Sequence, residues 1–143
     1  MLIFLSSSFC HENIKDIRKI HPERDIDGSH VYKTGALFVE PPDNFIEIAQ
    51  DVGASEVHLK YDTCTKERVD CIHEARMGSM AWFRGPPGMS EDIATKYWDV
   101  GNEDETMYLT LLKTGVQGLC VNKPNVLIDM LRSGQYECGP AFN

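Results

Sequence analysis

The sequence predicts an α/β fold, in which about five parallel strands alternate with helices. Short apolar runs typical of buried strands alternate along the chain with segments whose apolar residues recur at helical spacing. Near the end, Gly115 stops one helix, residues 119–121 form a strand, and Pro124 suits the first turn of another helix. Strands joined through helices pack as right-handed crossovers, so the predicted sheet is parallel.

The expected strands lie at residues 2–8, 31–39, 56–60, 80–83 and 119–121, paired in chain order. The segment 119–121 is a short apolar run between polar residues, and we expect it to be buried on both faces. This number of strands is too small to close an eight-stranded barrel, so the first and last strands should lack neighbours.

Helix boundaries follow from capping residues. Ile14, Ile17 and Ile20 recur at helical spacing, and Pro22 stops that helix. The second helix is expected to end at Gly53, and the third to start at Thr65, with Val69 and Ile72 inward and Gly78 beyond its end. The capping box Asn102-x-x-Glu105 is expected to open the next helix. The last helix is expected to start at Asn122, to bury Leu127, Met130 and Leu131, and to end at Gly134.

Composition limits the classes of protein that the chain can represent. With 143 residues, 42% hydrophobic and 25% charged, it fits one ordinary globular domain. The net charge of −8 argues against a nucleic-acid surface, which needs clustered basic residues. The apolar run 2–5 is too short for a signal peptide or a membrane span. Five cysteines form no disulfide framework, Cys71 and Cys120 are expected to be buried, and a reducing, cytoplasmic setting is expected.

Functional residues of parallel sheets gather at the carboxyl ends of the strands. The residues at or just after the expected strand ends are Ser8, Phe9, Glu40, the segment 60–62, the segment 82–84, Asn122 and Lys123. Among the histidines, only His58 falls near a strand end, together with Asp62. Histidines without matched spacing are more often structural than metal ligands, so no metal site is assigned.

Three segments lie in order along the chain: Ser8-Phe9 with the following helix and His21-Pro22, then Gly78-Ser-Met-Ala-Trp82, then the segment 115–124. Together they resemble the glycerophosphodiester phosphodiesterase family of the PI-PLC-like phosphodiesterase superfamily. Gly-Val-Gln-Gly-Leu-Cys-Val-Asn-Lys-Pro at 115–124 is similar to the family's last barrel strand, Gly-Val-Asp-Gly-Ile-Ile-Thr-Asp-x-Pro. Ser8-Phe9, a short helix and then His21-Pro22 resemble its Ser-Phe-Asp strand end, helix and x-Pro. Gly78-Ser-Met-Ala-Trp82 resembles its strand ending in Trp-Thr-Val-Asn, which follows a helix ending in His-x-x-Gly; here His73 precedes Gly78 by five residues.

The resemblance implies a TIM-type barrel and the metal-assisted hydrolysis of glycerophosphodiesters to glycerol 3-phosphate and an alcohol. A full barrel takes roughly 250 residues, so the chain is expected to hold only the fourth to eighth strands, in residues 1–134, followed by a tail at 135–143. The family's catalytic motifs, His-Arg-Gly, Glu-x-Asp, His-Asp and Glu-x-Lys, lie in its first strands. We expect none of them here, and hence no catalytic residue and no ligand for the Ca²⁺ or Mg²⁺ that the family implies.

The matches also contain departures from the family pattern. Cys10 stands where Asp is usual, Phe83 and Arg84 where Thr-Val is usual, and Val121 and Asn122 where Thr-Asp is usual. The chain is therefore interpreted either as a phosphodiesterase whose catalytic strands lie on other sequence, or as a non-catalytic pseudoenzyme or binding module. If a missing half completes it, the implied ligand is a glycerophosphodiester or lysophospholipid. Open sheet edges would also allow self-association.

The expected substrate-binding residues are Trp82, Phe9, Lys60, Arg84 and Asn122. Each has a structural alternative: Trp82 and Phe9 can be packing residues, and Lys60 and Arg84 can be solvated charges. The acidic run that includes Asp99, Glu103, Asp104 and Glu105 could attract Ca²⁺, but a helix dipole also explains acidic residues at a helix start. The segment 84–104, rich in Gly and Pro, is predicted to be the most mobile internal segment.

Overall fold

A computed structural model describes residues 5–83 and 103–134 of the chain, and within them five parallel strands form one sheet. The strands are β1 (Leu5–Ser8), β2 (Lys33–Phe38), β3 (Glu56–Lys60), β4 (Gly78–Trp82) and β5 (Gly118–Cys120). They are hydrogen-bonded in the order β1-β2-β3-β4-β5. The predicted parallel α/β fold and its chain-order pairing are confirmed. Residues 2–4 of the first expected strand, the segment 84–102 and the tail 135–143 lie outside the described residues.

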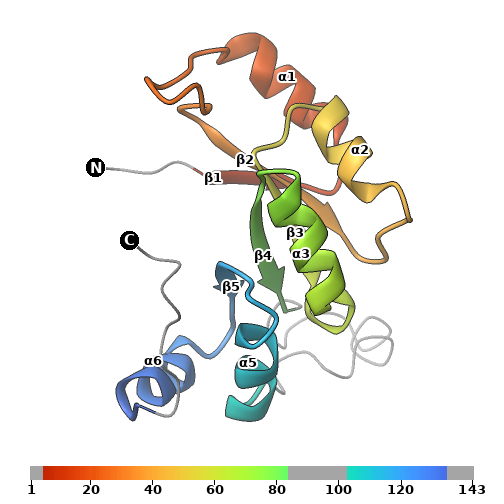
Figure 1. Cartoon of the computed structure of the whole chain (residues 1–143). Coiled ribbons are helices and arrows are strands. Elements are labelled where there is room, and N and C mark those ends of the chain that lie inside the picture. Colours follow the sequence, from red (N-terminus) through yellow and green to blue (C-terminus); the bar gives the residue numbers. More distant parts are fainter. Residues whose placement is uncertain (1–4, 84–102, 135–143) are drawn as a thin grey trace, which may run out of the picture.

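Helices connect the strands and cover the convex side of a curled sheet, as Figure 1 shows. They are α1 (Glu12–Ile20), α2 (Phe45–Asp51), the 3-10 turn η1 (Tyr61–Thr63), α3 (Lys66–Glu74), α5 (Glu105–Leu112) and α6 (Pro124–Arg132). The sheet curves as part of a TIM-type barrel does, and its concave side corresponds to the barrel interior. No helix among the described residues is long and apolar enough to cross a bilayer.

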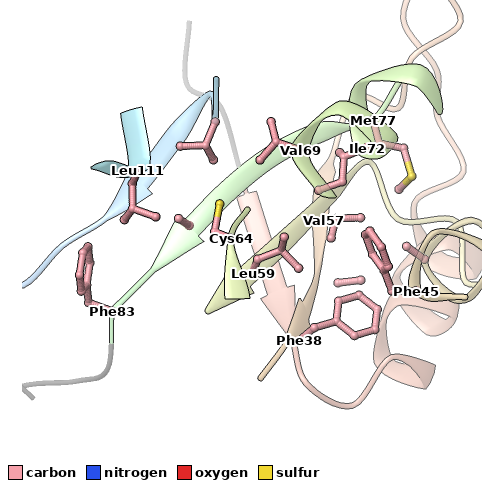
Figure 2. Packing of buried hydrophobic residues seen from close by; sticks show 14 of the residues in the cluster. Phe38, Phe45, Val57, Leu59, Cys64, Val69, Ile72, Met77, Phe83 and Leu111 are labelled. Carbon is pink, nitrogen blue, oxygen red and sulfur yellow. The ribbon is translucent and has the colours of Figure 1, made fainter. Parts of the chain in front are cut away.

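The hydrophobic core lies between the sheet and the helices, and Figure 2 shows its packing. Strand residues alternate in direction, and the apolar members that point toward the helices form the core. They include Ala36, Phe38, Val57, Leu59 and Ala81 from the strands and Phe83 directly after β4, packed with Ile14, Phe45, Ala49, Val69, Ile72 and Leu111. The predicted inward positions Val69 and Ile72 on α3 are confirmed, because both side chains are completely buried.

Glycines on the concave side make room for larger side chains from neighbouring strands. A Cβ atom at Gly35 would collide with the imidazole of His58, and one at Gly78 would lie 2.7 Å from Cγ of Glu56. The imidazole of His58 therefore occupies the space beside Gly35 of β2, and His58 is only 2% exposed. By contrast, Leu5, Phe9 and Val39 remain exposed. The concave face thus has a filled central layer and uncovered apolar side chains toward β1 and β2.

Several predicted helix boundaries are confirmed. The Thr65 hydroxyl accepts a hydrogen bond from the backbone N–H of Arg68 and so caps α3, as predicted. Pro124 occupies the first turn of α6. Gly53, Gly115 and Gly134 adopt positive φ angles after the helices that they were predicted to end.

Two predicted helix starts are wrong. Helix α5 is capped by Asp104, whose carboxylate accepts from the N–H of Met107 at 2.9 Å, instead of by a capping box from Asn102 to Glu105. A carboxylate placed three residues before that N–H satisfies it directly, so no earlier cap is needed. Asn122 does not cap α6 either, because its amide group is hydrogen-bonded to Glu103; the residue at the N-cap position is Lys123.

Gly78 lies beyond the end of α3, as predicted, but the residue around which the helix ends is Arg76. The helix stops at Glu74, and Arg76 adopts a left-handed conformation with φ of 57°, while Gly78 belongs to β4. The N–H of Met77 reaches back to the carbonyl of Ile72 at 3.1 Å, the bond that closes a Schellman turn around Arg76. Arg76 stands three residues after His73, so it occupies the glycine position of the His-x-x-Gly motif.

Strand β5 is less buried than predicted. It is the last strand in the sheet, and Cys120 is exposed, because no strand among the described residues covers its outer edge. On α6 only Met130 is buried, while Leu127 is half-buried and Leu131 is exposed. Cys71 is exposed on α3, so the prediction that Cys71 and Cys120 are both buried is wrong. At this end of the chain, the described residues therefore leave exposed some of the apolar side chains that the sequence pattern predicts to be buried.

Arg76→Gly should stabilise the fold. A left-handed conformation costs a non-glycine residue roughly 1–2 kcal/mol, and the greater freedom of glycine in the unfolded chain offsets about 0.4–1 kcal/mol of that. We therefore expect the free energy of unfolding to rise by roughly 0.5–1 kcal/mol, measured by urea denaturation.

The matched control is Glu74→Gly, which places glycine in the last helical turn of α3, at an exposed position. It should lower the free energy of unfolding by roughly 0.5–1 kcal/mol. Equal losses in the two variants would contradict the assignment of strain to Arg76.

Candidate functional site

The carboxyl ends of the strands lie along one edge of the sheet, and two aromatic residues meet there. Phe9 follows β1 directly, and Trp82 ends β4, yet their ring centroids are 5.3 Å apart in an edge-to-face arrangement. Two other strands separate β1 from β4 in the sheet. The contact can form only because the sheet curls and both rings project from its concave side. Phe9 is 57% exposed, so the pair is accessible from solvent.

Lys60 lies beside this aromatic pair. It ends β3, and its Cα atom is the register partner of that of Trp82. Its ammonium group forms an ion pair with Asp62, and its nitrogen lies 5.4 Å from the centre of the Tyr61 ring. The Lys60 side chain is only 11% exposed. Its charge therefore reaches the carboxyl edge already paired with a carboxylate, and an anionic ligand would have to compete with Asp62.

Asn122 is positioned by a buried carboxylate. The Glu103 side chain accepts from the backbone N–H of Asn122 at 2.7 Å and from the Asn122 amide group. The hydroxyl of Tyr108 donates to the same carboxylate at 2.8 Å. Glu103 is 2% exposed, so three donors stabilise a carboxylate that would otherwise be costly to bury. This network joins the start of α5 to the turn between β5 and α6.

The buried network changes the interpretation of Glu103 and determines the protonation state of Tyr108. Glu103 was assigned to an acidic helix start favoured by the helix dipole, but it precedes the cap Asp104 and is buried. Its backbone carbonyl also accepts from the Lys123 ammonium at 3.2 Å. Burial, and next the hydrogen bond with Glu103, raise the pKa of the Tyr108 hydroxyl. The phenol therefore stays protonated at neutral pH and acts as a donor to Glu103.

His58 and Asp62 do not form a joint site. The Nε2 atom of His58 lies 2.9 Å from a carboxylate oxygen of Glu56 on the concave side of β3. Asp62 instead pairs with Lys60. In residues 5–83 and 103–134, no group of three or more His, Cys, Asp or Glu side chains is arranged to hold a metal ion. These residues do not fit the divalent metal that the resemblance implies.

One catalytic-type motif does occur in the sequence, contrary to expectation. Glu23-Arg24-Asp25 matches the spacing Glu-x-Asp. These residues lie in the loop between α1 and β2, which leads to the amino end of β2, and Arg24 forms an isolated bridge with His30. Their position is at the opposite edge of the sheet from Phe9, Lys60 and Trp82. The match in spacing therefore does not create the family's carboxylate pair at the carboxyl edge.

The predicted substrate-binding residues thus have different outcomes in the structure. Phe9, Lys60 and Trp82 lie together on the concave side at the carboxyl edge. Asn122 is at the same edge, but its amide is engaged by Glu103. Arg84 lies outside the described residues. Glu103 and Tyr108 were missed as positioning residues, since an acidic residue in the run Asn-Glu-Asp-Glu carries no pattern that distinguishes a buried carboxylate from an exposed one.

Comparison with solved structures gives the class of fold. The chain is similar to a protein from Galdieria sulphuraria assigned as a glycerophosphodiester phosphodiesterase, with a TM-score of 0.70 and 23% identity over 90% of this chain and 43% of that one. It is also similar to an Oleispira antarctica phosphodiesterase in complex with its product sn-glycerol-3-phosphate, with a TM-score of 0.68 and 16% identity over 92% and 42%.

These likenesses show a partial TIM-type barrel of the kind found in glycerophosphodiester phosphodiesterases. The chain spans less than half the length of either protein. The structural neighbours are proteins of the family that the three sequence motifs resemble. No protein-family description and no curated protein matches the sequence.

Asn122→Asp should destabilise the protein, although it restores the family's usual residue. The new carboxylate would replace a donor to Glu103 with a second acceptor that is negatively charged at neutral pH. Breaking a buried hydrogen-bonded charge network costs about 3–5 kcal/mol, and we expect a loss of that order in urea denaturation at pH 7.

The loss should decrease in acid, because protonation of one carboxyl group restores a donor and removes the repulsion. The free energy of unfolding of the variant, relative to the native chain, should therefore fall as pH rises from about 4 to 7. The control is Asn125→Asp, in the exposed first turn of α6, where an acidic residue is favourable. Equal stability of the two variants would contradict the role of Glu103.

Proposed function

We propose that this chain supplies the carboxyl-terminal strands and the substrate-contacting rim of a phosphoric diester hydrolase that converts a glycerophosphodiester to glycerol 3-phosphate and an alcohol. The observation that carries this proposal is the meeting of Phe9, Trp82 and Lys60 on the concave side of the sheet. The parallel fold places all three at the edge where α/β barrels bind substrates.

Each of these residues has a chemical role that suits a glycerophosphodiester. The faces of Phe9 and Trp82 offer an apolar and cation-attracting surface for the alcohol part of the ligand, for example choline. The Lys60 ammonium can offset charge on a non-bridging phosphate oxygen, provided that Asp62 yields it. A glycerophosphodiester or a lysophospholipid therefore fits this rim, and we propose a cytoplasmic enzyme of glycerophospholipid metabolism.

The reacting groups must come from elsewhere in this proposal. Cleavage of a phosphodiester needs an acid and a base near the leaving oxygen, and positive charge at the non-bridging oxygens. At the carboxyl edge the described carboxylates include Asp62, which is paired with Lys60, Glu103, which is buried with three donors, and Glu40, which is exposed after β2. The Ca²⁺ or Mg²⁺ of the family would have to be held by residues of the strands that complete the barrel.

Two occupants can complete the sheet. Additional strands that carry the catalytic motifs would pair with the outer edges of β1 and β5, which have no neighbouring strand among the described residues. Alternatively, a second copy of this chain could pair at these edges. The first occupant gives an enzyme, and the second favours the alternative of a non-catalytic binding module. The commitment of Asn122 to Glu103 and of Lys60 to Asp62 supports that alternative.

The purified chain should not hydrolyse glycerophosphocholine. Two carboxylates at the carboxyl edge, Asp62 and Glu103, are engaged by other side chains, and no group of three or more side chains that could hold a metal ion is present among the described residues. Incubation with glycerophosphocholine and Ca²⁺ or Mg²⁺ should release no glycerol 3-phosphate in a coupled enzymatic assay. Metal-dependent release that is abolished by a chelator would contradict this expectation.

Binding at the rim should be detectable even without hydrolysis. In a Trp98→Phe background Trp82 is the remaining tryptophan, so its fluorescence reports on the rim. Glycerophosphocholine should change this emission in a saturable way, and Phe9→Ala should weaken the apparent affinity several-fold by removing the ring that packs against Trp82. Ile26→Ala is the matched control, because Ile26 is exposed in the α1–β2 loop. No saturable change in the Trp98→Phe chain would refute the proposed rim.

A further inference from the structure

A second hollow lies at the opposite edge of the sheet from the rim. This amino-end cavity, of about 350 Å³, is lined by the α1–β2 loop, the start of β2, the α2–β3 turn and the α3–β4 turn. Its basic lining residues are Arg24, His30, Lys33 and Arg76. No Asp or Glu is among its lining side chains in the described part of the chain. In a protein with a net charge of −8, such a concentration of positive charge requires a local explanation.

The carboxylates of the α1–β2 loop have hydrogen-bond or close partners within that part of the chain. Asp25 accepts a hydrogen bond from the N–H of Ile26, and Asp27 accepts one from the N–H of Ser29, both within the same loop. Glu23 lies 3.8 Å from the ring of His21. The acidic residues of the α1–β2 loop therefore organise its backbone or face His21, and they leave the basic groups of the cavity without a carboxylate of the loop in hydrogen-bond contact.

The guanidinium of Arg18 is a further positive charge next to the cavity, because it donates to residues of the cavity lining. The guanidinium of Arg18 donates to the carbonyls of Gly53 and Tyr32 and to the hydroxyls of Thr34 and Ser55. All four acceptors are neutral, so the charge of Arg18 is fixed in place without being neutralised by them. Two of these acceptor residues, Gly53 and Ser55, themselves line the cavity.

His30 carries an unmet hydrogen-bonding capacity at this site. Its Nδ1 atom is the one buried side-chain nitrogen or oxygen in the described residues that has no hydrogen-bond partner. Such groups are rare because leaving one unpaired is costly. Burial lowers the pKa of His30, and the charges of Arg18, Arg24 and Lys33 lower it further. The imidazole thus responds to the same cluster of positive charges that surrounds the cavity.

Arg76 supplies the last observation. Its left-handed backbone, with φ of 57°, is the one positive φ of a non-glycine residue in the described residues. Strained backbone conformations persist where the surrounding structure imposes them and often occur at ligand-binding positions. Glycine would relieve this strain, but it would also remove a guanidinium from the cavity.

From this arrangement we propose that the amino-end cavity binds a phosphate dianion, either free or as a phosphomonoester, through Arg24, Lys33, Arg76 and His30. A dianion matches the cluster better than a single carboxylate because it can accept from several cations at once. The hydroxyls of Ser29 and Ser55 add neutral donors to the lining. The cavity has more room than an inorganic phosphate needs, which leaves space for an esterified group. This site is separate from the proposed rim and does not depend on its chemistry.

The test is a titration of the full chain with inorganic phosphate and with ribose 5-phosphate, at constant ionic strength and pH 7. Isothermal titration calorimetry gives the affinity, and ¹⁵N spectra of the histidine rings report on His30. We expect saturable binding and a selective change in the His30 signals. Tighter binding of ribose 5-phosphate would assign the cavity to phosphate esters, and tighter binding of inorganic phosphate would assign it to the free ion; either supports the proposal.

Three variants separate binding from folding. Lys33→Met and Arg76→Gly should each weaken the affinity by about tenfold, since each removes a charge-assisted contact. Arg76→Gly is expected to be more stable than the native chain, so its loss of binding cannot result from unfolding. Lys66→Met removes an exposed lysine that pairs with Asp70 on α3 and should leave the affinity unchanged. Absence of saturable binding, unchanged affinity in Arg76→Gly, or an equal loss in Lys66→Met would overturn the proposal.

Discussion

Parallel pairing of the strands is the constraint on which the rest of this structure depends. Because β1 to β5 all run in one direction, every strand ends at one edge of the sheet and begins at the other. Residues far apart in sequence, such as Phe9 and Trp82, therefore meet at the carboxyl edge, while Arg24 and Arg76 share the amino edge. Because the sheet curls, the side chains at the carboxyl edge that project from its concave side face one another. The two candidate sites are consequences of strand direction.

Periodicity was sufficient to predict much of this arrangement. The spacing of apolar residues located all five strands to within a few residues, and Thr65 and Pro124 marked helix starts because their effects are local to a single turn. The same reasoning identified Phe9, Lys60 and Trp82, since a residue that follows a buried strand in a parallel sheet must lie at the carboxyl edge. Local chemistry and strand direction are properties that a sequence expresses directly.

Other features depend on contacts between distant segments and carry no local pattern. Glu103 is buried because Asn122 and Tyr108 converge on it, and nothing in its neighbours distinguishes it from Asp104, which serves as a cap. The exposure of Cys120 follows from the place of β5 at the end of the sheet. The left-handed conformation of Arg76 occurs where glycine is the usual residue, so the sequence gives a misleading signal there.

The guanidinium of Arg18 links segments that are far apart along the chain. From α1 it reaches residues at the start of β2 and in the turn before β3, so one side chain connects the first helix to two strands. Such a link makes the first two βα units open together instead of one at a time. Amide protons of α1 and β2 should therefore exchange with solvent as a single cooperative group. A chain assembled from repeated βα units would in this way behave, in its first half, as one foldon.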